Sequence, residues 1–146
     1  MFVNPYPYAS GSEEGDGVSV PITVADLQGY QGNPFVINDD DIIKREKYDI
    51  MKMIDPGDAE KKREVWHMFP GVYEFTSDVF LNVPKGHVAY LVPTTDIFNA
   101  GCNISSVLMR DTFKGMIVGQ LVVNGGEFFL QPKKVIAELV MQKVGE

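Results

Sequence analysis

The sequence predicts an all-β domain, built as a sandwich or a barrel-like fold. Three observations support this prediction. Short runs of β-branched and aromatic residues recur through the second half of the chain. Turn-forming residues separate these runs, most clearly at Asn124-Gly125-Gly126, which is a strong signal for a tight turn. Apolar residues at helical spacing are rare, so little helix is expected.

Composition places the chain among ordinary globular proteins. Its 146 residues fit one domain, and 45% of them are hydrophobic while 23% are charged. The formal net charge of −7 argues against binding to nucleic acid and against docking on an acidic membrane, because both need clustered Lys and Arg. A nucleoside triphosphate is not excluded, since it needs only a local basic patch or backbone amides.

Further features bear on the compartment. Cys102 is the one cysteine, so no internal disulfide can form, and a buried apolar role is expected for it. No apolar run has the length of a membrane span, and the first residues do not have the pattern of a secretory signal. We therefore expect a protein that is made in the cytoplasm, of cellular or viral origin.

Residues 1–17 differ in composition from the rest of the chain. They contain two prolines and three glycines, together with Tyr6 and Tyr8. Such a segment is expected to form an extended arm or a poorly ordered tail. The two tyrosines would let this arm bind a protein partner. The remaining residues, 18–146, are expected to form a single β domain.

The first strand is expected over residues 19–24, where a proline indicates an edge position or a strand start. A second short strand is expected over residues 34–37. Residues 39–66 are much more charged, and we expect a solvated insertion outside the core, made of a loop and a short helix capped by Asp58. Trp66 is expected to pack where the insertion rejoins the core.

A regular succession of strands is expected after Phe69-Pro70-Gly71. The expected strands cover residues 72–76, 79–83, 88–92, 104–108, 116–123, 127–130 and 135–144. The last run is ambiguous. Its residues 135, 136, 139 and 140 would suit a helix, whereas residues 135, 137, 139 and 141 would share one face of a strand.

Six short motifs occur along the chain in a characteristic order. They are Pro21-Ile22-Thr23-Val24-Ala25-Asp26-Leu27, Phe69-Pro70-Gly71 with the strands up to Pro84, Pro93-Thr94-Thr95-Asp96, Val107-Leu108-Met109-Arg110-Asp111-Thr112-Phe113-Lys114-Gly115, Gly119-Gln120-Leu121-Val122-Val123-Asn124, and Pro132-Lys133-Lys134-Val135-Ile136-Ala137-Glu138-Leu139-Val140. In order and separation they resemble the dUTPase and dCTP deaminase family over residues 18–144. The resemblance implies a distorted jelly-roll, a homotrimer, and nucleotide sites between subunits.

The resemblance places the family's catalytic positions on altered residues. In the dUTP hydrolases an Asp three residues before the aromatic residue of a hairpin activates water, a general-base role. Arg110 stands at that distance from Phe113, and an arginine cannot accept a proton. Asp111 follows, and it would face the site only if a bulge turned it there. Asp111 is therefore the candidate catalytic residue, and a solvated hairpin tip is the alternative.

The resemblance also implies a proton-shuttling Glu in the strand after this hairpin, as the deaminases have. The matching residue is Gln120, whose amide cannot shuttle protons at neutral pH. Deamination of cytidine nucleotides is therefore not expected. Gln120 is either a substrate-binding residue or an ordinary polar residue between sheet neighbours. Leu108 and Phe113, from the hairpin, are further candidates for the substrate site.

The family's phosphate-binding loop carries an Arg and hydroxyl residues. Thr94 and Thr95 keep two hydroxyls, but the Arg is missing and Asp96 adds a repelling charge. A plain turn would also explain these residues. Asp26, in the first motif, is the remaining candidate for substrate binding, and its alternative role is to accept hydrogen bonds from backbone amides in a local turn.

Two functions are compatible with these residues. The favoured one is a non-catalytic trimer that keeps the dUTPase-like scaffold for a structural or regulatory role. The alternative is an active deoxynucleoside triphosphate pyrophosphohydrolase, which converts dUTP to dUMP and pyrophosphate with Mg²⁺ on the phosphates. Loss of the base and of the loop Arg favours the first. Neither His67 nor His87 has the spacing of metal ligands, so no metal held by the protein alone is expected.

Overall fold

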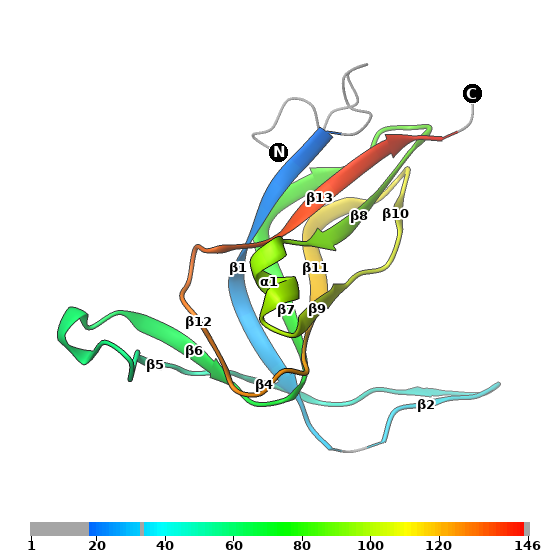
Figure 1. Ribbon diagram of the computed structural model, residues 1–146. Coiled ribbons are helices and arrows are strands. Elements are labelled where there is room, and N and C mark those ends of the chain that lie inside the picture. The colour runs from blue at the N-terminus through cyan, green and yellow to red at the C-terminus, as the bar shows by residue number, and fades with distance from the viewer. Residues whose placement is uncertain (1–17, 33, 145–146) are drawn as a thin grey trace.

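The computed structural model describes residues 18–32 and 34–144. Nearly all regular structure in these residues is strand, which confirms the predicted all-β class (Figure 1). The predicted N-terminal arm, residues 1–17, lies outside the described residues. None of the helices in the described ranges is long and apolar enough to cross a membrane.

A curled antiparallel sheet forms the body of the molecule, with strand order β10-β8-β13-β1-β7-β11-β9 and with β4 paired to β1. Its strands are β1 (Val18–Tyr30), β4 (Lys47–Asp49), β7 (Gly71–Asn82), β8 (His87–Pro93), β9 (Cys102–Ser105), β10 (Met109–Arg110), β11 (Lys114–Val123) and β13 (Val135–Lys143). The smaller elements are β2 (Val36–Ile37), β3 (Ile42–Ile43), β5 (Lys52–Ile54), the 3-10 turn η3 (Ala59–Lys61), β6 (Glu64–Met68), helix α1 (Thr95–Asn99) and β12 (Phe128–Leu130).

Strand β1 belongs to both halves of this sheet. Up to Thr23 it pairs with β13, and from Val24 it pairs with β7. The register shifts on either side of this crossing mark β-bulges, which bend a strand and increase its twist. The bend lets the sheet curl over itself, so that its two halves enclose a common core (Figure 1).

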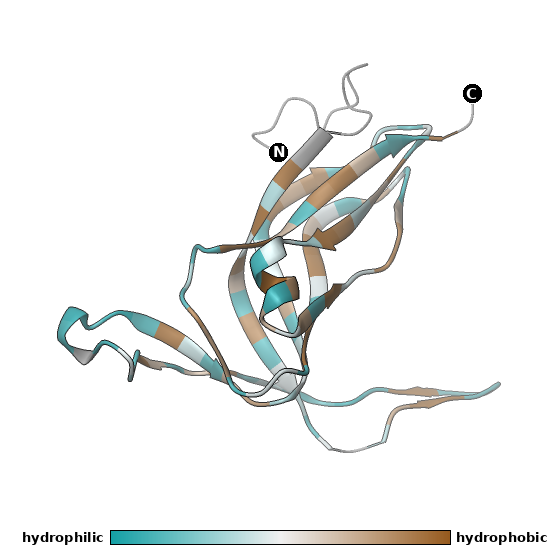
Figure 2. Cartoon of the chain, in the orientation of Figure 1, coloured by the Kyte–Doolittle hydropathy of each residue, from teal (hydrophilic) through white to brown (hydrophobic). Residues whose placement is uncertain are grey.

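The core is built from the inner faces of the sheet. Phe75, Leu81, Ile117, Leu121 and Leu139 are fully buried in it. Along β7 and β11, buried residues alternate with more exposed ones, as a strand with one buried face requires. Figure 2 shows the resulting bands of hydrophobic and hydrophilic residues along the strands of the body.

Several local predictions are confirmed. The ambiguous last segment is strand β13, and Leu139 and Met141 share its buried face. Trp66 is only 3% exposed and packs in the core at β6. Cys102 is buried as predicted, and this burial raises the pKa of its thiol, against a smaller opposing effect of a hydrogen bond with the backbone of Asn124.

The prediction of two strands over residues 72–76 and 79–83 is wrong. Strand β7 is continuous from Gly71 to Asn82. The polar pair Ser77-Asp78 suggested a break, but Ser77 is fully buried and its hydroxyl accepts a hydrogen bond from the amide of Val79 at 3.1 Å. The polar pair instead marks a bulge within one strand, because Met116 of β11 pairs with Phe80 whereas Val118 pairs with Thr76.

The charged insertion is partly as predicted, because a short helical segment follows Asp58, but it is a single 3-10 turn, η3. Most of the insertion is exposed, but Lys47–Asp49 form β4 in the main sheet, and Val65 and Trp66 are buried. The other strands of this region pair as β2 with β3 and β5 with β6. Two arms result. The first arm, residues 34–46, contains β2 and β3, and the second arm, residues 51–64, contains β5, η3 and the start of β6. They extend from the same end of the body toward opposite sides (Figure 1).

Two further predictions need correction. Residues 107–115 do not form a two-stranded hairpin, because β10 pairs with β8 whereas β11 pairs with β7 and β9. The plain turn that was the alternative interpretation of residues 93–96 is the start of helix α1, with Thr94 as its N-cap. The first error concerns strand partners that are distant in sequence, and the second concerns the conformation of a short connecting segment.

Candidate functional site

A row of polar residues crosses the outer face of the sheet. Five strands contribute one residue each, and neighbours in the row are direct cross-strand partners: Ser105, Gln120, Glu74, Gln28 and Asp49. The row arises because each residue occupies an outward position of its strand, opposite the buried residues of the core. Such direct neighbours are close enough for their side chains to interact.

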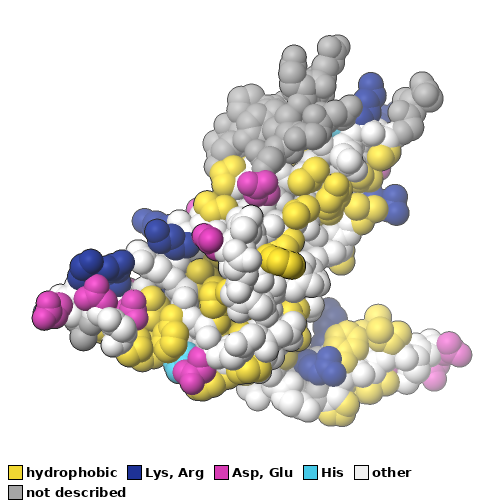
Figure 3. Space-filling view, in the orientation of Figure 1, with side chains coloured by type: hydrophobic (Ala, Val, Ile, Leu, Met, Phe, Trp, Pro, Cys, Tyr) yellow, Lys and Arg dark blue, Asp and Glu magenta, His cyan; other side chains and the backbone are white. Residues whose placement is uncertain are grey.

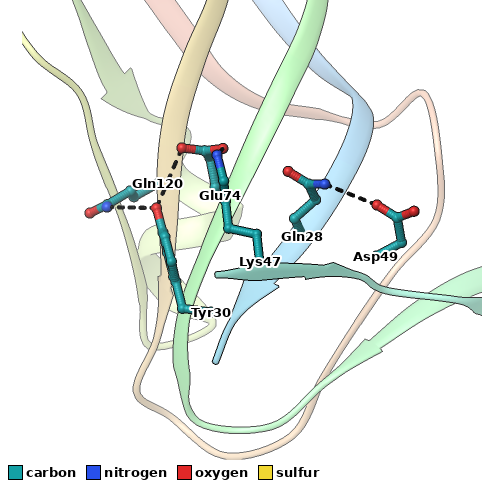
Figure 4. A network of polar contacts seen from close by, with 6 residues as sticks. All are labelled: Gln28, Tyr30, Lys47, Asp49, Glu74 and Gln120. Atoms are coloured by element: carbon teal, nitrogen blue, oxygen red, sulfur yellow. Dashed lines mark hydrogen bonds and ion pairs between the residues drawn. The ribbon is translucent and has the colours of Figure 1, made fainter. Parts of the chain in front are cut away.

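Hydrogen bonds connect this row to Tyr30 and Lys47, a cross-strand pair beside it (Figure 4). The Gln120 side-chain amide donates to the hydroxyl of Tyr30 at 3.1 Å, and this hydroxyl donates to one oxygen of Glu74 at 3.5 Å. The ammonium of Lys47 contacts the other Glu74 oxygen at 2.7 Å. Farther along the row, the Gln28 amide donates to Asp49 at 3.0 Å.

Glu74 is the centre of this group, and the sequence analysis did not identify it. Its side chain is 22% exposed, so the carboxylate is partly shielded from water. The hydrogen bond to Glu74 is the main cause that raises the pKa of Lys47, with partial burial as a smaller opposing effect. Lys47 therefore remains a cation beside this carboxylate at neutral pH. Only the pairing register of β7 with β11 reveals that Glu74 stands beside Gln120.

Two open pockets adjoin Gln120. One has a volume of about 560 Å³ and is lined by Tyr30, Gln31, Phe35, Arg45, Val72 and Gln120. The other has a volume of about 370 Å³ and is lined by Glu74, Ser105, Ser106, Val107, Val118, Gly119 and Gln120. Both fall within the size range of small-molecule sites. The side chains that line these pockets can bind a polar ligand by hydrogen bonds, and Glu74 contributes a carboxylate to this group.

Asp26 lies on the same strand as Gln28 and Tyr30. It is exposed and pairs with Thr76 within the sheet. Its alternative role in a local turn is therefore wrong, because the residue is part of strand β1. Alternation along the strand places Asp26 on the outer face with the polar row.

The phosphate-loop candidates occupy the beginning of helix α1. The Thr94 hydroxyl accepts a hydrogen bond from the amide of Ile97 at 3.4 Å, the usual contact of a helix N-cap. The Thr94 amide donates to the carbonyl of Ile136 at 3.1 Å. Thr95 and Asp96 are exposed. The hydroxyl and the amide of Thr94 are thus used in contacts within the chain, whereas the side chains of Thr95 and Asp96 face solvent.

The candidate base and its neighbours lie in the turn between β10 and β11. Asp111 is half-buried, and Phe113 packs against the core while its amide donates to the carbonyl of Arg110 at 3.0 Å. Leu108 is 45% exposed, just before β10. The structure brings Asp111 and Phe113 together in one turn.

Within one chain the candidate base and the helix α1 candidates are far apart. Arg110 pairs with Val88 near the start of β8, whereas Thr94 follows directly after the end of this strand. A strand rises by about 3.3 Å per residue, so the length of β8 separates the two groups by roughly 20 Å. The chain alone therefore does not assemble the predicted site.

No protein-family model matches the sequence, and no curated protein is similar to it in sequence. The structure does have a solved counterpart. It is similar to the crystal structure of 2'-deoxycytidine 5'-triphosphate deaminase from Agrobacterium tumefaciens, with a TM-score of 0.59 over 87% of this chain. The shared feature is the fold. Sequence identity is 8%, and the match covers 39% of the deaminase chain.

The comparison supports the predicted fold and does not test the predicted site residues. The chain has the all-β fold of the dUTPase and dCTP deaminase type, as the motifs implied. An identity of 8% carries no information about substrate or activity, because one fold can support unrelated functions. The chemistry of this chain has to be argued from its own side chains.

Proposed function

We propose that this chain is a non-catalytic member of the dUTPase-like trimers, with a structural or regulatory role. The observation that supports it most is the environment of Gln120. An amide stands where the resemblance implies a proton-shuttling carboxylate, and it is used in a hydrogen bond to Tyr30. An amide neither releases nor accepts a proton at neutral pH, so this position cannot perform deamination.

The surroundings of Gln120 do not replace the missing carboxylate. Glu74 is the nearby acid, and both of its oxygens are engaged, one by Lys47 and the other by Tyr30. Each oxygen keeps a further lone pair, but these two contacts hold the carboxylate against neighbouring strands. The ion pair and the phenol instead give Glu74 the role of joining strands β1, β4, β7 and β11.

The proposal is tested by product release together with ligand binding. The full-length protein is incubated with dUTP and dCTP in the presence of Mg²⁺, and both pyrophosphate and ammonia are measured. Thermal unfolding is followed in the same samples, because a ligand at about 100 times its dissociation constant stabilises the native state by about 2.7 kcal/mol. We expect neither product with either nucleotide. A stabilising shift without product would indicate a nucleotide-dependent regulatory role.

One observation favours the pyrophosphohydrolase as a second candidate. Asp111 is half-buried beside Phe113, and it forms no ion pair with any other residue in the described ranges. In a trimer, a neighbouring helix α1 would supply Thr95, and Mg²⁺ would neutralise charge on the phosphates. Release of pyrophosphate from dUTP that Asp111→Asn abolishes would establish this function and exclude the non-catalytic one.

A further inference from the structure

The tip of the first arm is an acidic turn. Asn38 organises it, because its side-chain oxygen accepts hydrogen bonds from the amides of Asp40 and Asp41, both at 2.8 Å. The turn places Asp39, Asp40 and Asp41 side by side in solvent, at the end of the arm (Figure 3). None of the three carboxylates forms an ion pair with another described residue. We call residues 38–41 the acidic tip.

A basic hollow lies on the second arm. Its volume is about 440 Å³, and it is lined by Ile54, Lys62, Arg63, Glu64, Gln131 and Pro132. The second arm supplies one side of the hollow, and the connection between β12 and β13 supplies the other. Lys133 and Lys134 directly follow the lining residue Pro132 and are exposed. We call this the basic hollow.

The cations of the hollow are only partly neutralised within the chain. Arg63 contacts one oxygen of Asp58 at 3.1 Å, and Lys61 contacts the same oxygen at 3.5 Å. Lys62, Lys133 and Lys134 form no ion pair in the described part of the chain. Glu64 also lines the hollow, so its surplus of positive charge rests on Lys62 together with Lys133 and Lys134 beside it. Figure 3 shows Lys and Arg side chains on this arm, with Asp and Glu side chains toward its end.

Apolar side chains accompany both charged surfaces. On the first arm Ile37 is 74% exposed and Ile42 is 62% exposed. On the second arm Met51 is 80% exposed and Ile54, which lines the hollow, is 44% exposed. Exposed apolar residues concentrated on two projecting hairpins are typical of contact surfaces between chains.

We propose that the acidic tip of one copy of this chain binds the basic hollow of a second copy. The two arms extend toward opposite sides of the body, so the tip cannot reach the hollow of its own chain (Figure 1). A second copy carries the matching surface, three carboxylates against the cations of the hollow. The isoleucines next to the tip would then lie against Ile54 and Pro132 of the partner.

Where the tip of each copy binds the hollow of a different neighbour, the contact is heterologous and repeats from copy to copy. A heterologous contact closes into a ring when the rotation between copies allows it, and a trimer is such a ring. The contact does not depend on whether the protein turns over nucleotides. Failure of the inference and failure of the proposed function are therefore observed in separate experiments.

A crosslinking experiment between two distinguishable copies tests the contact. One full-length chain carries Asp40→Cys and a second chain, of different tag length, carries Lys134→Cys. The two are co-expressed, purified together and treated with a short bis-maleimide. Each variant alone is the control, and it also accounts for any reaction of the buried Cys102. We expect a covalent heterodimer from the pair and none from either variant alone.

Charge reversal then tests the recognition itself. Lys62→Glu with Arg63→Glu in the Lys134→Cys chain should abolish the heterodimer, and Asp39→Lys with Asp41→Lys in the other chain should restore it. Lys85→Glu with Lys114→Glu, two exposed positions of the body, is the matched control and should leave the product unchanged. High salt should reduce the yield, because screening weakens exposed charge pairs.

Two results would overturn the inference. One is the absence of heterodimer from the co-expressed pair, and the other is a heterodimer whose yield the Lys62→Glu and Arg63→Glu changes do not alter. If heterodimer is absent and inorganic phosphate raises the melting temperature of the native chain but not of this reversed variant, the hollow holds a small anion instead of the acidic tip.

Discussion

The body and the two arms contain similar hydrophobic residues, but these are buried in the body and exposed in the arms. In the body, Phe75 and Leu139 are fully buried, and long strands pair on both sides. In the arms, Ile37 and Met51 are 74% and 80% exposed, and the strands of the arm hairpins are two to five residues long. Hydrophobic, β-branched composition therefore does not by itself produce a stable sheet. A second layer that buries one face is also required.

This difference in burial indicates that the body provides the stability of the fold and that the arms are suited to contacts with other molecules. Isolated two-stranded hairpins are at best marginally stable in water, whereas sheets of three or more strands with a buried face are stable. The body meets this condition within a single chain. The first arm does not, because β2 and β3 pair only with each other. In the second arm β5 joins β6 and β12 in a three-stranded sheet, but β5 itself is exposed. We infer that contact with a second copy covers the exposed strands of both arms. The following substitutions would sharpen this division or remove it.

The largest effect is expected from a core truncation. Phe75→Ala removes a fully buried ring and should reduce the free energy of unfolding by about 3–5 kcal/mol. The matched control is Phe35→Ala in the first arm, where the ring is 41% exposed, and about 0.5 kcal/mol or less is expected. Urea unfolding of dilute protein, followed by circular dichroism, measures both. Equal losses would remove the distinction between body and arms.

A smaller effect is expected from overpacking the same part of the core. A Cβ at Gly119 would lie 2.7 Å from Cζ of Phe75 and 3.0 Å from Cδ1 of Leu91. Gly119→Ala should therefore cost about 1–3 kcal/mol, because the ring has to move in a closely packed interior. Gly32→Ala is the control, since nothing lies within 4 Å of its Cβ position. Chemical denaturation of the two variants gives the comparison, and an unchanged midpoint for Gly119→Ala would contradict the packing described.

Tyr73 provides a test of pH dependence at the edge of the core. Its hydroxyl donates to the carbonyl of Phe69 and accepts from the amide of the same residue, both at 2.9 Å. Burial raises the pKa of Tyr73, with the Phe69 hydrogen bond as a smaller opposing effect. The neutral phenol is thus favoured in the folded state, so its contribution is complete below the ordinary pKa of 10.0 and is lost as the pH rises through the raised value.

Tyr73→Phe should therefore lower stability by about 1 kcal/mol at neutral pH and flatten the loss of stability at alkaline pH. Urea midpoints measured on either side of pH 10.0 give the result. The same alkaline slope in the variant and in the native chain would show that Tyr73 is not the group that titrates.

The smallest effect is expected at the polar row. Gln120→Glu places a second carboxylate directly opposite Glu74, and like charges at paired positions cost about 0.2–1 kcal/mol. Protonation of a carboxyl removes the repulsion, so the lost stability should return as the pH falls toward about 4.3. Gln142→Glu, at an exposed position of β13, is the control. A loss that does not depend on pH would exclude charge repulsion as its cause.

Local patterns predicted part of this structure well. The all-β class, the burial of Trp66 and Cys102, and the strand at the C-terminal end follow from alternation and turn residues near each position. The break expected at Ser77 is a bulge inside one continuous strand, where the register against β11 shifts. The hairpin expected at residues 107–115 failed because β10 and β11 choose partners distant in sequence.

The site was less predictable for the same physical reason. Gln120 was identified from a motif, but Glu74, Tyr30 and Lys47 were not, although all four now form one group. Their proximity depends on the pairing register of β1, β4, β7 and β11, and register is a property of the assembled sheet. Asp111 and the residues at helix α1 were expected in one site, and their relation across subunits stays a prediction.

The most direct test of this division is hydrogen exchange of the backbone, measured by mass spectrometry on the assembled protein and on the Lys62→Glu, Arg63→Glu variant. We predict that peptides covering residues 34–46 and 51–64 are protected in the native assembly and exchange much faster in the variant, while β1, β7 and β11 keep their protection in both. Arms that exchange equally fast in both proteins would contradict the claim that a second copy orders them.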